Sequence, residues 1–130
     1  MKAEYLHPPV VHFPIAFYFL ELLLLVLWAA RRRDDYLRFA RFSFRTGYVF
    51  MLFALGAGLH DAGGPSGITG LVRRHFFAAV SVFICYTLRI FSWRRGQTAP
   101  NYKLLLLAGA LLGCTLVLLT GDLGGDLVYK

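Results

Sequence analysis

Four histidines are the residues of this sequence that could ligate a metal ion or a cofactor: His7, His12, His60 and His75. The first two lie in the stretch LHPPVVHFPIA, which opens a long apolar run. A neutral imidazole ligates haem iron, zinc or copper without adding net charge, so histidines beside apolar sequence are candidate ligands. Which of them act together depends on the elements that position them.

Composition predicts that these elements are membrane-spanning helices. The chain has 130 residues, of which 58% are hydrophobic and 16% are charged, and a small soluble domain cannot bury that much apolar surface. Four apolar runs, at about 10–30, 42–60, 75–93 and 104–120, are long enough to cross the hydrocarbon layer as helices. We therefore predict an all-α fold, a bundle of four transmembrane helices with short loops, as a single membrane domain over residues 1–130.

The distribution of the net charge of +7 predicts the topology. Arginines gather between the first two runs and around the link between the last two, and few basic residues flank the opposite side. By the positive-inside rule, the Arg-rich loops are cytoplasmic and both termini lie on the outer, periplasmic side of a bacterial inner membrane. The basic loops then meet anionic lipid headgroups, and no nucleic-acid partner is expected. The first run is too long for a signal peptide, so we interpret it as a retained span.

This topology brings all four histidines toward the outer surface. His12 lies about one turn inside the first helix, where an unpartnered imidazole is costly and marks a functional position. Because bundle cores take ligands from facing helices, we expect His12 and His75 to meet, with a bend at Pro14 that aims His12 inward. The small residues Ala78 and Ala79 below His75 would leave room for a flat cofactor. The alternative is four interfacial histidines that bond to headgroups or water.

Two charged residues inside the predicted spans each require a partner. Glu21 follows His12 by nine residues, which places it about 13.5 Å deeper and on the opposite side of the helix. We expect Glu21 to form a structural ion pair with Arg89, with Arg45 as the competing partner. Arg89 belongs to a stripe of three- and four-residue steps on the third helix that also holds His75, Ala78, Ala79, Val82, Tyr86 and Trp93.

The cysteines and the chain end carry weaker signals. Cys85 and Cys114 belong to no CxxC or CxxCH motif, so we interpret them as buried small hydrophobic residues. The terminal GDLGGDLVYK combines glycines with carboxylates and predicts a polar exit loop, or a lid over the outer end of the bundle. No nucleophile–base triad, phosphate loop or paired-carboxylate site is recognisable, so we do not expect a hydrolytic enzyme.

The stretches LHPPVVHFPIA, GAGLHDAGG, RRHFFA and GDLGGDLVY together resemble a family of bacterial four-helix membrane proteins catalogued as domain of unknown function 2231. The resemblance spans nearly the whole chain, and its first and last motifs are the specific ones. It maps the histidines of the family pattern onto His7, His12 and His75, whereas His60 stands where relatives are expected to carry an apolar residue. In related proteins such domains occur beside cytochrome or Rieske modules, so the resemblance implies redox work without assigning an activity.

Two classes of function follow. In the first, the chain is a small redox protein that binds b-type haem through His12 and His75, with His7 or His60 as a replacement ligand or second site. In the second, it is a non-catalytic accessory subunit of an electron-transport or photosynthetic complex, and its histidines bind lipid, pigment, metal or a neighbouring chain. A copper or zinc ion held by histidines is a third alternative. We expect partners in every case: membrane or periplasmic redox subunits, or further copies of the chain.

Overall fold

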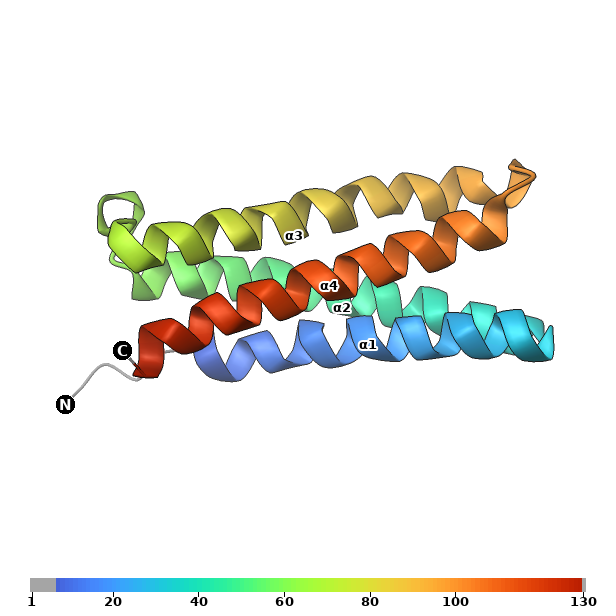
Figure 1. The fold of residues 1–130 in the computed structure, drawn as a ribbon, viewed down its shortest axis with the longest axis horizontal. Helices are drawn as coiled ribbons and strands as arrows, with labels where there is room; N and C mark the ends of the chain where they lie inside the picture. The colour runs from blue at the N-terminus through green and yellow to red at the C-terminus, as the bar shows by residue number, and fades with distance from the viewer. Residues whose placement is uncertain (1–6, 130) are drawn as a thin grey trace.

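The computed structural model describes residues 7–129 and contains only helices, turns and short connections in that range. Four long helices form an up-and-down bundle, in which α1 begins and α4 ends at the same end of the molecule (Figure 1). The elements are α1 His7–Arg31, α2 Asp34–Asp61, η1 Pro65–Gly67, α3 Gly70–Arg95, η2 Gly96–Thr98 and α4 Tyr102–Tyr129.

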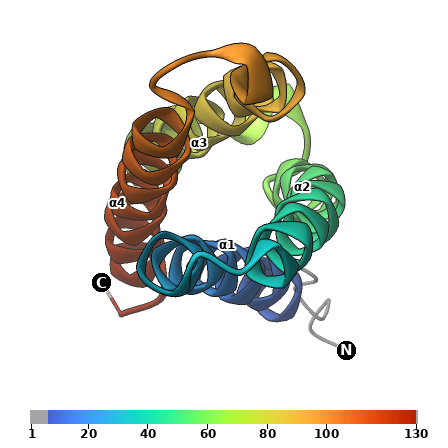
Figure 2. The ribbon, with the colours of Figure 1, turned by 90° about the vertical axis from the view of Figure 1, so that its right-hand side faces the viewer.

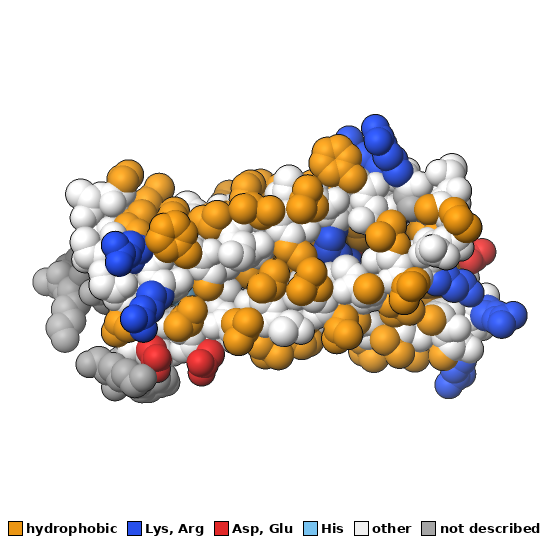
Figure 3. All heavy atoms as spheres, turned by 45° about the horizontal axis from the view of Figure 1, so that its top comes forward, with side chains coloured by type: hydrophobic (Ala, Val, Ile, Leu, Met, Phe, Trp, Pro, Cys, Tyr) orange, Lys and Arg blue, Asp and Glu red, His pale blue; other side chains and the backbone are white. Residues whose placement is uncertain are grey.

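All four α-helices are long and apolar enough to cross a membrane, which confirms the predicted four-helix membrane bundle. Large hydrophobic side chains cover the middle of the visible face, and most Lys and Arg side chains gather toward its two ends (Figure 3). We call the end with Arg31–Arg33 and the turn η2 the basic end, and the end with His60 and the turn η1 the histidine end. Which end faces the cytoplasm stays a prediction.

Three helix ends differ from the sequence prediction: α3 begins at Gly70 rather than near residue 75, and the start of α2 and the end of α4 differ more. α2 begins at Asp34 rather than near residue 42, after a short link in which Arg32 has a φ of 54°. Asp34 and Asp35 lie in the first turn of α2, where carboxylates interact favourably with the helix dipole. α4 continues to Tyr129, so the predicted exit loop or lid at the chain end is wrong. Both helices outrun their apolar stretches because backbone hydrogen bonding continues beyond the roughly 30 Å hydrocarbon layer.

The connection from α2 to α3 begins with a Schellman motif. The Gly63 N–H donates to the carbonyl oxygen of His60, and the Gly64 N–H donates to that of Leu59. Gly63 has a φ of 76°, in the left-handed region that this motif requires and that glycine adopts without strain. The GG pair in GLHDAGG therefore ends α2 and turns the chain toward α3.

The helices pack as two antiparallel pairs, α1 with α2 and α3 with α4, and contacts between α1 and α4 join the pairs. α2 and α3 make far fewer contacts, and they lie apart in the view along the bundle (Figure 2). The interior is largely aromatic. Tyr18 and Tyr86 stack with their ring centroids 3.5 Å apart, and Phe44 lies beside Tyr86 and Trp93. Leu25, Leu106, Met51 and Trp28 are also buried, and many other large apolar side chains face outward, toward lipid.

Candidate functional site

His12 does not point into the bundle. Its side chain is exposed, whereas Pro14, Tyr18 and Glu21 on the same helix are buried. Nine residues separate His12 from Glu21, which is two and a half turns, so a helix that buries Glu21 turns His12 outward. The expectation that Pro14 aims His12 across the bundle at His75 is therefore wrong. Pro14 lies inside α1 and the helix continues through it.

His75 packs against α4. Its Nδ1 lies 3.1 Å from the carbonyl oxygen of Thr120, and its ring lies against Gly124. A Cβ atom at Gly124 would approach the His75 Cε1 atom to 3.1 Å, so the glycine makes room for the imidazole. Two stretches of the sequence that carry the family resemblance, RRHFFA and GDLGGDLVY, therefore meet in space. Ala78 and Ala79, the small residues below His75, are half-buried.

The other histidines also lie at or near this end. His60 is exposed, and its Nδ1 lies 3.3 Å from a carboxylate oxygen of Asp61. α1 begins at His7, but the side chain of His7 lies outside the described part of the structure. Within the described residues, no three His, Cys, Asp or Glu side chains gather in a way that could hold a metal ion. Binding of haem, copper or zinc by these histidines stays a prediction.

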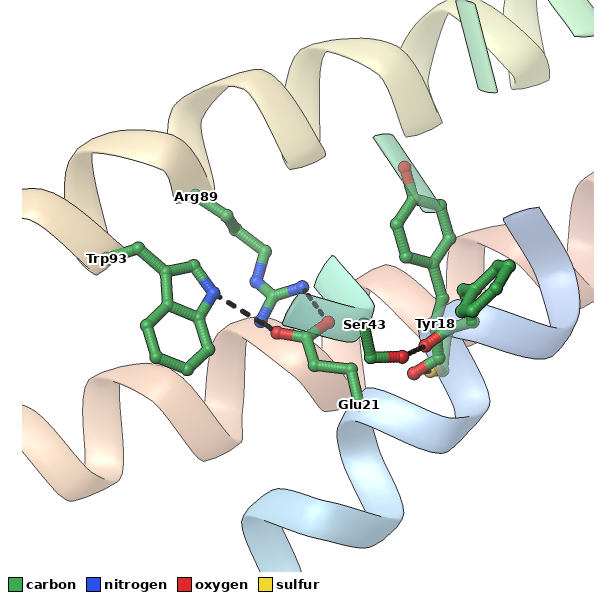
Figure 4. A network of polar contacts seen from close by, with 7 residues as sticks. Tyr18, Glu21, Ser43, Arg89 and Trp93 are labelled. Atoms are coloured by element: carbon green, nitrogen blue, oxygen red, sulfur yellow. Dashed lines mark hydrogen bonds and ion pairs between the residues drawn. The ribbon is translucent and has the colours of Figure 1, made fainter. Parts of the chain in front are cut away.

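The most buried polar network of the described residues joins α1 to the last two turns of α3 (Figure 4). Arg89 donates from Nη1 to Glu21 Oε2 at 2.9 Å and from Nη2 to Glu21 Oε1 at 2.6 Å. The indole Nε1 of Trp93 donates to the same Oε1 at 3.2 Å. The side chain of Glu21 is 0% exposed and that of Arg89 is 5% exposed. Of the two partners weighed for Glu21, the structure places Arg89 there, and Arg45 is exposed.

Aromatic rings and a glycine enclose the guanidinium of Arg89. Its Cζ atom lies 5.1 Å from the ring centre of Phe44 and 5.0 Å from that of Tyr86, which are cation–π distances. On α4, a Cβ atom at Gly109 would lie 3.0 Å from the Arg89 Nε atom. The pair is therefore surrounded by side chains of α2 and α3 and by the bare backbone of α4, so all four helices meet around it.

Close contacts of α1 with α2 and α4 fix the neighbouring turns. Ser43 on α2 donates from Oγ to the carbonyl oxygen of Phe17 at 2.6 Å, and the Tyr18 hydroxyl donates to the Met51 sulfur at 3.3 Å. Cys114 on α4 donates from Sγ to the carbonyl oxygen of Tyr18 at 3.5 Å. Cys114 is buried, which agrees with its interpretation as a small core residue, and Cys85 is only half-buried.

This arrangement limits the chemistry of Glu21. Both carboxylate oxygens accept hydrogen bonds from charged or indole donors, and no solvent reaches the side chain. A buried ion pair that is satisfied in this way holds its partners in place, and its separation would leave an uncompensated charge in a medium of low dielectric constant. The geometry therefore suits a fixed joint between helices better than a group that exchanges protons or binds a substrate.

Sequence reasoning missed the indole donor and the aromatic enclosure of this network. Tyr86, Arg89 and Trp93 share one stripe at helical spacing, and the structure buries all three. That stripe was the available signal. Residues one turn before and one turn after a buried arginine lie on the same face of the helix, so they are expected to contact its side chain and its partner. The contribution of Phe44 could not be read in the same way, since it depends on the rotation of α2 against α3.

Comparison with known proteins gives a match to one family. The family model described as "Predicted membrane protein (DUF2231)" matches residues 4–130. No curated protein and no solved structure matches the chain.

Proposed function

Because the chain belongs to the DUF2231 family of predicted membrane proteins, we propose a function that its buried network supports: a non-catalytic membrane subunit. In this proposal the Glu21–Arg89–Trp93 network holds α1 and α3 in one register. The rigid bundle then presents its histidine end to a neighbouring chain of a larger membrane complex.

The observation that carries this proposal is the complete burial of the Glu21 carboxylate with hydrogen bonds to both of its oxygens. It accepts three hydrogen bonds, with at least one at each oxygen, and it is 0% exposed, so both oxygens are paired and neither has access to water. A carboxylate that worked as a proton relay would need a path for the proton and a chain of exchangeable partners. The surroundings are instead aromatic rings and glycine backbone, which favour a fixed arrangement.

The histidine end supports the second half of the proposal. His12 and His60 are exposed at different positions there, where side chains can bond to a partner chain or to lipid headgroups. In the proposed orientation this end faces the periplasm and the basic end faces the cytoplasm of a bacterial inner membrane, because arginines concentrate at the basic end. A periplasmic or membrane-embedded redox subunit is the class of partner that we propose.

A redox function with b-type haem is the second candidate, and one observation favours it. His75 holds its ring through Nδ1 against a backbone carbonyl, the arrangement that commonly orients a ligating histidine. Within one chain, however, His12 and His75 do not fit a haem between them, since His12 faces outward from α1. Haem would supply one-electron transfer, and His12 could contribute a ligand only at a contact with a second chain. Copper or zinc would need such a shared site as well.

The two candidates are separated by purifying the protein in mild detergent from haem-replete cells. We expect a helical, cooperatively unfolding protein that has no stoichiometric haem, copper or zinc by reduced-minus-oxidised spectra and metal analysis. About one haem per chain, with a sharp α band that is lost in His75→Ala, would overturn the non-catalytic proposal. Asp61→Asn serves as a control at the same end, because it changes a polar side chain without removing an imidazole.

A further inference from the structure

A pocket of about 430 Å³ opens between α2 and α3 toward the basic end of the bundle. This is the seam at which the two helices make few contacts. Three arginines line the pocket: Arg45 and Arg94 are exposed and Arg41 is half-buried, and we call the part that they line the mouth. Most of the other lining residues are apolar or aromatic, with Tyr48 on α2 and Ile90 on α3. The pocket is therefore amphipathic, with cationic groups near the membrane surface and an apolar part that leads toward the hydrocarbon layer.

The charge of the pocket is uncompensated. Its lining contains no Asp or Glu. Elsewhere at the basic end, Arg33 and Arg38 both lie within ion-pair distance of Asp35. Among the described residues, no carboxylate lies within ion-pair distance of the three pocket arginines. Three guanidiniums that share one mouth repel one another, so an anion placed among them lowers the free energy of the site.

Arg41 supplies a second and independent observation. Its Cζ atom lies 5.4 Å from the ring centre of Trp93, so the side chain is held across the seam from α2 to α3. Its Nε atom is buried and has no hydrogen-bond partner among the described residues. A buried N–H without an acceptor is unfavourable, and a phosphate oxygen is an acceptor that matches guanidinium geometry.

The position of the mouth along the helices indicates that the phosphate belongs to a lipid headgroup. Arg94 is one residue from the end of α3, and Arg41 lies about 10 Å after the start of α2, so both reach the level of lipid headgroups. Below the mouth, Val49 is exposed and Ile90 half-buried along the open seam, where an acyl chain would lie beside them. We infer that this pocket binds one anionic phospholipid, with its phosphate among Arg41, Arg45 and Arg94 and an acyl chain along α2 and α3.

The test measures lipid retention by the purified protein in mixed micelles of detergent with phosphatidylglycerol or phosphatidylcholine, by native mass spectrometry. We expect wild type to retain one phosphatidylglycerol per chain in preference to phosphatidylcholine. Arg41→Gln with Arg45→Gln should weaken retention by about tenfold or more, because it removes charge-assisted hydrogen bonds. Arg31→Gln with Arg32→Gln is the matched control, since it removes the same charge from exposed positions outside the pocket and should change little.

Val49→Trp tests the apolar part of the pocket without a change in charge. It should also reduce the retention of phosphatidylglycerol. Its circular dichroism spectrum and melting temperature should stay those of wild type. Equal loss in the Arg31/Arg32 control would overturn the site in favour of general surface attraction. Equal retention of phosphatidylcholine, or full displacement of the lipid by soluble glycerol phosphate, would overturn the recognition of an anionic lipid. A dimer that forms through this seam and excludes lipid would show that a second copy occupies it.

Discussion

Gly113 on α4 gives the sharpest prediction about the packing of the bundle, because an added methyl group has no room there. A Cβ atom at Gly113 would lie 2.6 Å from both Cζ and the hydroxyl oxygen of Tyr86. Carbon atoms in contact prefer about 3.5–4.0 Å, so the ring would have to retreat by roughly 1 Å. It cannot retreat freely, since Tyr86 is 0% exposed and is stacked on Tyr18 at a centroid distance of 3.5 Å.

The expected cost of Gly113→Ala follows from two opposing effects. Overpacking of a tight core costs about 1–3 kcal/mol, and replacing glycine by alanine inside a helix returns up to about 1 kcal/mol. We therefore expect the free energy of unfolding to fall by about 1–2 kcal/mol, measured by reversible unfolding in mixed micelles of mild detergent and sodium dodecyl sulfate. Gly56→Ala is the matched control, because a Cβ atom at Gly56 would have nothing within 4 Å. If Gly113→Ala proves as stable as Gly56→Ala, the close packing of α3 on α4 is refuted.

Three further predictions use the same protein. Trp93→Phe removes the indole donor to Glu21 and should cost about 1–3 kcal/mol in the same unfolding assay, whereas no loss would remove Trp93 from the network. Gly124→Ala should destabilise wild type more than it destabilises a His75→Ala background, because the added methyl contacts that imidazole; equal effects in both backgrounds would refute the contact. A single cysteine introduced in the 32–33 link should react with an impermeant maleimide only after the membrane is permeabilised, and labelling of intact cells would reverse the proposed orientation.

The sequence predicted the class and the number of helices because hydrocarbon thickness sets the length of an apolar run. It did not predict where the helices end. Hydropathy detects the part of a helix that lies in hydrocarbon, but α2 starts at Asp34 and α4 runs to Tyr129 through polar residues. Helical hydrogen bonding and charges such as Asp35, which pairs with Arg38 one turn later, stabilise these polar turns.

The outward orientation of His12 could have been predicted from the sequence. Once Glu21 is assigned to the interior with Arg89, helical geometry places a residue nine positions earlier on the outside. The two expectations, an inward His12 and an inward Glu21, were incompatible, and the cost of burying a charge decides between them. By contrast, the choice of Arg89 over Arg45 depends on how α2 and α3 rotate about their axes, and spacing within one helix carries no information about that rotation.

The central claim is that the Glu21–Arg89 pair is a structural joint, and a double-mutant cycle tests it most directly. Glu21→Leu and Arg89→Met each leave one uncompensated buried charge, and each should cost about 3–5 kcal/mol of unfolding free energy. The double variant removes both charges and should cost at least about 2 kcal/mol less than the sum of the singles.

The exposed pair Asp35–Arg38 is the control, because its N–O distance is also 2.6 Å. Its cycle with Asp35→Asn and Arg38→Gln should give a coupling of about 0.5 kcal/mol or less. Single variants at Glu21 and Arg89 as mild as those of the control, with additive effects in the double variant, would contradict the structural role. A large coupling confined to the buried pair is the result that the proposal predicts.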